Sequence, residues 1–287
     1  MLPAKVAILG PGLIGGSLAL ALRDSDPSRP VSLWARRDAT VQEVQRAGFR
    51  DAGTDLAAAV RDASVVVFCV PVEKIADLAR DVVLHCPNSA CITDVGSTKQ
   101  RVVDWMDPLF PGRFVGSHPM AGSEKSGFAA ASTTLFRGAP CILTPTSRAL
   151  TEAIEGIRRL WLEVGARVEL MTAAAHDRLV ARISHLPHLA ASALVQLLGE
   201  HGSESQRFAG TGYRDTTRVA AGSAELWAGI LSENRAEIVS ALDEFVAILQ
   251  NSRALLSENR LSELHDFLFR AKTTRDQFPV HPVARDV

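Results

Sequence analysis

Lys5–Leu22 has the sequence KVAILGPGLIGGSLALAL, which predicts a strand, a glycine turn and a helix in direct succession. In the pattern GxGxxG, the first glycine makes the tight turn, the second lets a pyrophosphate approach the helix N-terminus, and the third lets helix and strand pack closely. A second strand, predicted at Val31–Ala35, follows at the distance expected in a dinucleotide-binding unit. The residues of the turn predicted to bind the cofactor are Gly10, Gly12, Leu13, Ile14 and Gly15.

Two later strands are predicted to end at the same crevice. Ser64–Val70 and Ala90–Thr93 are short apolar runs of the kind buried in a parallel sheet, and a helical pattern separates them. In an open parallel sheet, ligands bind outside the carboxyl ends of the strands. We therefore expect Val70 and Pro71 to contact the cofactor and Ser97 to lie near it. Capping of the helix that follows is the alternative role for Ser97.

The end of the second strand bears on which dinucleotide is bound. An acidic side chain there would bind the ribose 2′-hydroxyl of NAD, but this chain has Ala35. Arg36 and Arg37 follow, and guanidinium groups at this place would bind the 2′-phosphate of NADP. Two solvated arginines at a strand end are the alternative. The sequence favours NADP, with NAD possible, because the missing carboxylate and the added arginines point in one direction.

The spacing of apolar residues changes after the predicted strand Ala166–Leu170. From Thr172 onward the apolar spacing is helical and no strand run occurs. This predicts an α/β, Rossmann-type dinucleotide-binding domain over residues 1–171 and an all-helical domain over residues 172–287. Ala224–Gln250, read as one helix, carries more apolar surface than one packing partner needs. We therefore expect a homodimer built through the helical domain.

Two polar segments are candidate sites. Val115–Gly127 has the sequence VGSHPMAGSEKSG and is predicted to be a surface loop, for which a solvated turn is the alternative. His185-Leu186-Pro187-His188 places two histidines around a proline that should kink its helix, and these histidines could be core residues or site residues. The side chains of the first segment that can bond or ionise are Ser117, His118, Ser123, Glu124 and Lys125.

Composition limits the class of ligand. The 287 residues carry a formal net charge of −1, which argues against nucleic acids and anionic membranes as partners and favours small molecules. The uncharged stretch Val6–Leu22 is shorter than the ~20 residues of a membrane-spanning helix, and glycines break it. Four cysteines without metal-ligand spacing predict reduced thiols in a cytoplasmic protein and no metal site.

Five motifs together resemble the prephenate dehydrogenase family, which includes the arogenate and cyclohexadienyl dehydrogenases of tyrosine biosynthesis. In chain order they are GPGLIGGS at 10–17, DVGSTK at 94–99, GSHPMAGSEKSG at 116–127, SHLPH at 184–188 and YRDTTR at 213–218. The resemblance covers nearly the whole chain. It implies an oxidative decarboxylation of prephenate or arogenate with hydride transfer to NAD(P)+, giving 4-hydroxyphenylpyruvate or tyrosine.

The resemblance also implies roles for single residues. His118 would be the catalytic histidine, Ser97 would bind the substrate ring hydroxyl, and Arg218 would anchor the side-chain carboxylate. The family is usually a dimer through its helical domain. Many members keep an aspartate where this chain has Ala35, so the use of NAD does not carry over. The residues implied to line the substrate pocket or its mouth are His188, Ser123 and Glu124.

Two other functions remain open from the sequence. A β-hydroxyacid dehydrogenase shares the glycine turn and a helical second domain, but it typically uses a lysine from that domain, and no lysine occurs between Lys125 and Lys272. A non-catalytic dimer that senses NADP would leave the polar segment without a role. Prephenate and arogenate stay equal candidates, because the carboxylate anchor serves both, and feedback by tyrosine stays open.

Overall fold

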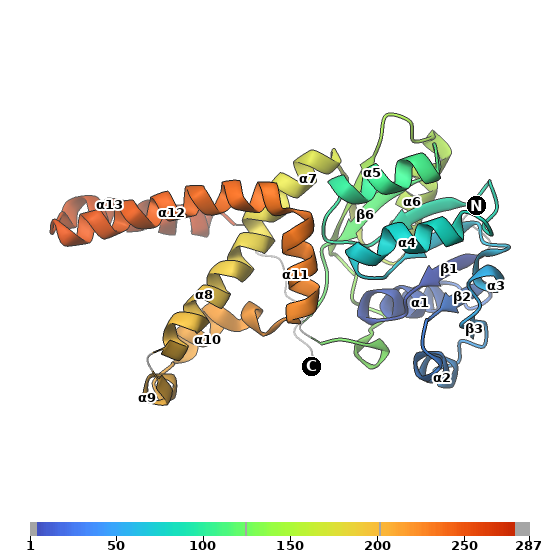
Figure 1. Ribbon diagram of the computed structural model, residues 1–287, viewed down its shortest axis with the longest axis horizontal. Coiled ribbons are helices and arrows are strands. Elements are labelled where there is room, and N and C mark those ends of the chain that lie inside the picture. The colour runs from blue at the N-terminus through green and yellow to red at the C-terminus, as the bar shows by residue number, and fades with distance from the viewer. Residues whose placement is uncertain (1–4, 124, 201, 279–287) are drawn as a thin grey trace. The chain divides into compact units, whose positions relative to one another are not determined.

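The computed structural model describes residues 5–123, 125–200 and 202–278 (Figure 1). The chain forms two compact units, Met1–Ile238 and Val239–Val287, which are described separately. In the described ranges, no helix combines the length and the apolar character that crossing a membrane requires.

The first unit is built on a parallel sheet of five strands in the order β3-β2-β1-β4-β5. Leu9 at the end of β1 aligns with Trp34 on one side and with Phe68 on the other. The carboxyl ends of these strands therefore lie along one edge, as the alternation of strands and helices predicts. The strands are β1 (Val6–Leu9), β2 (Val31–Trp34), β3 (Ala52–Gly53), β4 (Val65–Phe68) and β5 (Cys91–Asp94).

Helices cover both faces of this sheet, because successive residues of a strand point to opposite sides. On one face, Val6 and Ile8 share an apolar core with α1 (Leu13–Ser25), α2 (Asp38–Arg46) and α6 (Thr151–Glu163). On the other face, Ala7 and Leu9 share a core with α3 (Leu56–Val60), α4 (Val72–Val82) and α5 (Gln100–Leu109).

The later strands of this unit form a second, mixed sheet. It consists of β6 (Val115–Pro119), β7 (Pro140–Pro145) and β8 (Arg167–Leu170), in that order. β6 pairs antiparallel with β7, and β7 pairs parallel with β8. The direction reverses because the described residues between β6 and β7 form only the short 3₁₀ turn η1 (Phe128–Ala130) and no crossover helix. A bridge between Ile92 and Phe114 connects the two sheets.

Only helices follow β8 in the described part of the chain, which confirms the predicted fold class. The domain division at residue 171 stays a prediction. α12 (Arg235–Ser257) begins at the end of the first unit and continues into the second, where α13 (Leu261–Asp276) follows it. The earlier helices are α7 (Ala173–Val180), α8 (Leu186–Glu200), α9 (Gly202–Arg207), α10 (Thr211–Thr217) and α11 (Ala224–Glu233).

One helical segment differs from its prediction. Ala224–Gln250 is not one helix, because α11 ends at Glu233 and the buried Asn234 separates it from α12. The side chain of Asn234 bonds to other elements instead of continuing an apolar face. Gly210–Arg218, which contains the motif at 213–218, is mostly α10. Its polar side chains fit a helix because hydroxyls such as that of Thr217 donate to carbonyls four residues earlier.

Candidate active site

A pocket with a volume of about 400 Å³ lies at the carboxyl edge of the parallel sheet. Six of the nine predicted cofactor residues line it, namely Gly10, Gly12, Arg36, Arg37, Val70 and Pro71. Leu13, Ile14 and Gly15 are not part of the lining. The pocket also contains side chains from α2 and α4, which no sequence motif marks because only the packing of these helices turns them toward the crevice. These are Thr40, Glu43, Lys74 and Leu78.

The glycine turn has the geometry that a phosphate site requires. Gly10 has φ +104°, and a Cβ there would lie 2.6 Å from the carbonyl oxygen of Cys69. A Cβ on Gly15 would lie 2.3 Å from the carbonyl oxygen of Gly10. A Cβ on Gly12 would meet no atom within 4 Å, so the backbone there faces open space. Within α1, which is described throughout, the first turn contains no acidic residue and no side chain caps it, leaving its N–H groups for an anion.

His118 lies on a strand and not in the surface loop predicted for Val115–Gly127. Residues 115–119 form β6, and His118 is only 8% exposed. The polar composition was misleading because helices packed on the strand satisfy these side chains. The hydroxyl of Ser117, for example, accepts a hydrogen bond of 3.0 Å from the indole N–H of Trp161. His118 is in an extended strand, as the following Pro119 predicts.

Three side chains form a hydrogen-bonded line that ends at His118. Nδ1 of His118 lies 2.8 Å from Nε2 of His176, and Nδ1 of His176 lies 2.7 Å from Oδ1 of Asp177. Because a carboxylate only accepts, Nδ1 of His176 donates, and its Nε2 accepts from Nδ1 of His118. Nε2 of neutral His118 then carries no proton, and no described residue bonds to it. No sequence motif marks His176 and Asp177, since a His-Asp pair in a helix is not a signal in itself.

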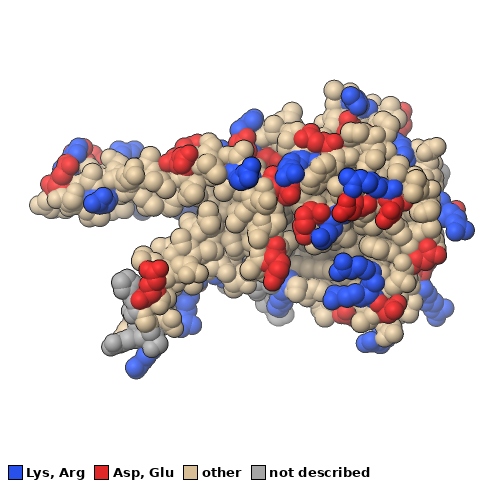
Figure 2. Space-filling model, viewed as in Figure 1, with Lys and Arg blue, Asp and Glu red and all other residues tan. Residues whose placement is uncertain are grey.

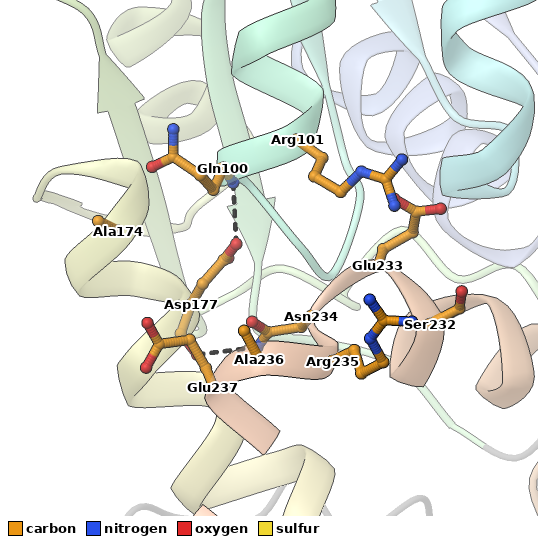
Figure 3. A pocket seen from close by; sticks show the side chains of 10 residues that line it. All are labelled: Gln100, Arg101, Ala174, Asp177, Ser232, Glu233, Asn234, Arg235, Ala236 and Glu237. Atoms are coloured by element: carbon orange, nitrogen blue, oxygen red, sulfur yellow. Dashed lines mark hydrogen bonds and ion pairs between the residues drawn. The ribbon is translucent and has the colours of Figure 1, made fainter. Parts of the chain in front are cut away.

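Asp177 also joins α7 to α5. Its carboxylate accepts hydrogen bonds from the backbone N–H groups of Lys99 (2.8 Å) and Gln100 (2.9 Å), so it caps α5 from another helix. The side chain of Asn234 donates to the carbonyl oxygen of Asp177 (2.9 Å) and lies 3.1 Å from Nδ1 of His185. Figure 3 shows Asp177 and Asn234 at the wall of a cavity of about 340 Å³. The position of the line is thus fixed by α5, by α7 and by the junction between α11 and α12.

Burial sets the protonation of this line. It lowers the pKa of His118 well below the ordinary histidine value, and the nearby His176, Lys99 and His185 lower it further. Burial also lowers the pKa of His176, against the opposing effect of Asp177. Burial raises the pKa of Asp177, but hydrogen bonds from His176 and from the N-terminus of α5 outweigh it, and the net shift is downward. At neutral pH the line therefore consists of two neutral imidazoles and a carboxylate.

The motif at 94–99 provides a buried ion pair and an open hydroxyl. Nζ of Lys99 contacts Oδ2 of Asp94, and neither side chain is exposed. Asp94 also accepts hydrogen bonds from the backbone N–H groups of Gly96 (2.8 Å) and Ser117 (3.2 Å). Ser97 lies between Asp94 and Lys99 in the sequence. It is half-buried, and no described residue bonds to its hydroxyl. It does not cap α5, so the alternative role for Ser97 is wrong and its hydroxyl remains available.

The helical segment brings His188 and Arg218 into one region. A π-helical turn, Ala181–His185, precedes Pro187 and confirms the predicted irregularity. His188 is buried at the start of α8 and stacks on Trp227, with 3.6 Å between ring centroids. The 3₁₀ turn that begins with Arg218 packs against α8. Arg218 is exposed, and its guanidinium has no partner among the described residues.

The loop after β6 leads from His118 to the cofactor pocket. Ser123 is exposed there, and its hydroxyl accepts a hydrogen bond of 3.2 Å from the backbone N–H of Lys125. Glu124 lies outside the described residues. Gly127 and Phe128, at the end of the loop, line the cofactor pocket. The structure thus joins the His118 strand to that pocket, whereas contacts of Ser123 with a substrate stay a prediction.

Comparisons with known proteins agree over both parts of the chain. Residues 18–170 match the family model for the nucleotide-binding domain of prephenate dehydrogenase, and residues 172–270 match that for its dimerization domain. Prephenate dehydrogenase of Bacillus subtilis strain 168 is 36% identical, over 96% of this chain and 76% of that protein. Cyclohexadienyl dehydrogenase of Zymomonas mobilis is 35% identical, over 88% of each chain. A crystal structure of A. aeolicus prephenate dehydrogenase with hydroxyphenyl propionate and NAD+ superposes with a TM-score of 0.91, at 29% identity over 96% of this chain and 98% of that one.

Proposed function

Because the chain belongs to the family of prephenate, arogenate and cyclohexadienyl dehydrogenases, which serve tyrosine biosynthesis, we propose that His118 is the base of its reaction. The chain is an oxidoreductase that decarboxylates a cyclohexadienol with the help of a nicotinamide dinucleotide. The observation that supports the role of His118 is the hydrogen-bonded line to His176 and Asp177, which leaves its Nε2 free to accept a proton.

Each residue of the site has its own role in the proposed reaction. His118 accepts the proton of the substrate hydroxyl as hydride leaves the same ring carbon, and it returns the proton to the phenol oxygen once CO₂ has left the opposite carbon. Aromatisation of the ring drives this step. His176 and Asp177 hold His118 in the proton-accepting tautomer and are positioning residues. When bound, the nicotinamide supplies the hydride acceptor. Ser97 hydrogen-bonds the ring hydroxyl, while His188 and Ser123 line the substrate pocket.

The proposed anchor of the substrate is Arg218, because its exposed guanidinium has no partner among the described residues and lies in the turn packed on α8. Arg218→Ala should raise KM about 10- to 100-fold while kcat changes less, since a bidentate carboxylate contact acts in both the ground state and the transition state. Steady-state kinetics measure this. Arg214→Ala, on the preceding helix, is the matched control. Collapse of cofactor affinity in Arg218→Ala would assign Arg218 to the fold instead.

We also propose NADP as the preferred cofactor, with NAD as a possible second. The residues present fit a dinucleotide, since the turn at Gly12 faces open space and a phosphate-binding helix start follows. Ala35 offers no carboxylate to a ribose hydroxyl, and Arg36 and Arg37 line the pocket. The A. aeolicus relative was crystallised with NAD+, so this preference is argued from the residues of this chain alone.

Replacing Arg36 tests that preference. Arg36→Ala should weaken NADP binding by about 5- to 50-fold and NAD binding by less than about 2-fold, because only NADP loses a charge-assisted partner. Dissociation constants from calorimetry give both values. Equal losses for the two cofactors would refute the assignment.

The chain is further proposed to form a homodimer through its helical part, which matches a dimerization-domain model. In the second unit, α12 exposes large apolar side chains, among them Val246, Ile248 and Leu249. Leu249→Glu should shift the chain to a monomer in sedimentation, because it buries a charge at an apolar interface. Gln250→Glu adds the same charge one position along and is the control. A monomeric unmodified chain at micromolar concentration would contradict the proposal.

A steady-state comparison of prephenate and arogenate, each with NADP and with NAD, tests the proposed function as a whole. It gives four values of kcat/KM. The expected result is turnover of at least one substrate, with the larger value for NADP. Absence of turnover with all four combinations would leave only the dinucleotide-binding role.

A further inference from the structure

The cofactor pocket contains a third cation that lies outside the glycine and arginine motifs. Lys74 is in the first turn of α4, which begins directly after β4 and Pro71. In the sheet, β4 is next to β1 on one side, and β2 with its following arginines is next to β1 on the other. Lys74, Arg36 and Arg37 therefore line the same pocket from opposite sides of the glycine turn.

All three cations are free to bind a ligand. Lys74, Arg36 and Arg37 are exposed, and their side chains make no ion pair or hydrogen bond with the residues that the structure describes. By contrast, Arg80 on the same helix α4 is paired with Asp77 at 2.6 Å. Figure 2 shows Lys and Arg side chains gathered beside a hollow on the viewed face of the α/β part.

The charge of the lining matches a phosphate monoester. The residues that line the pocket include one acid, Glu43, and the three cations. The formal charge of these four side chains is therefore positive. A phosphate monoester carries about −1.5 to −2 charges near pH 7, whereas a ribose hydroxyl carries none. This lining therefore attracts the 2′-phosphate of NADP, whereas NAD has no 2′-phosphate and gains no such attraction.

We propose that Lys74 is a specificity-determining residue, whose ammonium binds the 2′-phosphate of NADP together with Arg36 and Arg37. The inference rests on the proposed NADP preference. It adds that selectivity comes from α4 as well as from the end of β2. Lys74 offers three N–H donors on a flexible stem, and this suits a phosphate that two planar guanidinium groups already approach.

Binding of two nucleotide fragments tests the proposal without turnover. Adenosine 2′,5′-bisphosphate and 5′-AMP differ only in the 2′-phosphate, and calorimetry on the full chain gives both dissociation constants. Lys74→Gln should weaken the bisphosphate about 5- to 20-fold and 5′-AMP less than about 2-fold. Lys74→Arg should restore most of the bisphosphate affinity, because it restores the charge. Arg80→Gln, which removes a cation from the same helix outside the pocket, should leave both constants unchanged.

The outcomes separate the role of Lys74 from the cofactor preference. If the unmodified chain favours the bisphosphate and Lys74→Gln keeps that ratio, Lys74 has no part in selectivity and the inference fails, while the NADP proposal stands. Equal losses for both fragments overturn it too, because Lys74 would then act on the adenosine part. If the unmodified chain binds both fragments equally, the preference for NADP fails together with the role of Lys74.

Discussion

His118→Asn is expected to lower kcat by roughly 10²–10⁴ while the dinucleotide still binds normally. Asparagine preserves a polar side chain on β6 beside His176 but has no group that accepts a proton near neutral pH. Binding should persist because His118 is not in the lining of the cofactor pocket. Single-turnover measurements at saturating substrate report the chemical step directly.

The pH dependence of the unmodified enzyme provides a second measurement of the same role. Only neutral His118 can accept a proton, so kcat/KM should fall on the acid side. Burial, His176 and Lys99 lower the pKa of His118 well below the ordinary value of 6.5. A lowered pKa keeps the imidazole neutral to more acidic pH, and the acid limb should therefore lie below the usual histidine range.

The control for His118→Asn is His85→Asn. His85 is exposed, and its ring bonds no described residue, so this variant should keep both kcat and the acid limb. Near-normal kcat in His118→Asn, or an acid limb that the substitution leaves in place, would show that the proton goes to another group. His188 is then the next candidate.

Lys99→Met is expected to lower the free energy of unfolding by about 3–5 kcal/mol, because it leaves the carboxylate of Asp94 buried without its counter-charge. Both side chains are fully buried, and Asp94 connects the end of β5 with β6. Denaturant unfolding at a fixed protein concentration measures the change. Lys99→Met combined with Asp94→Asn should be less destabilised than Lys99→Met alone, because no unpaired charge remains.

Arg80→Met is the control for this stability prediction, since it breaks an exposed ion pair on α4 and should have little effect. If Lys99→Met unfolds as the unmodified chain does, water or another group must compensate Asp94, and the pair is not a structural element of the site. A loss as large in the double variant as in the single one would show that the packing of the Lys99 side chain matters, and not its charge.

Local sequence patterns predicted the parts of this protein that depend on local geometry. Gly10 and Gly15 are required by a tight turn and a close helix contact, which any chain with this strand-turn-helix order must make, and the structure confirms both. Polar composition misled at β6, where Ser117 and His118 are buried because partners distant in sequence satisfy them. The prediction of one helix over Ala224–Gln250 is also wrong, since the break at Asn234 depends on a hydrogen bond to α7.

By itself, the sequence determined the dinucleotide-binding fold and the change to helices from Thr172 onward, because strand period, helix period and glycine spacing act over a few residues. His118 became the candidate base through the resemblance of its motif to the prephenate dehydrogenase family. Only the tertiary structure decided which nitrogen of His118 is free. That depends on His176 and Asp177, which lie 58 and 59 positions further along the chain and reach His118 through the packing of α7 on α5. A tautomer is fixed by hydrogen-bond partners in space, and spacing along the chain carries no record of them.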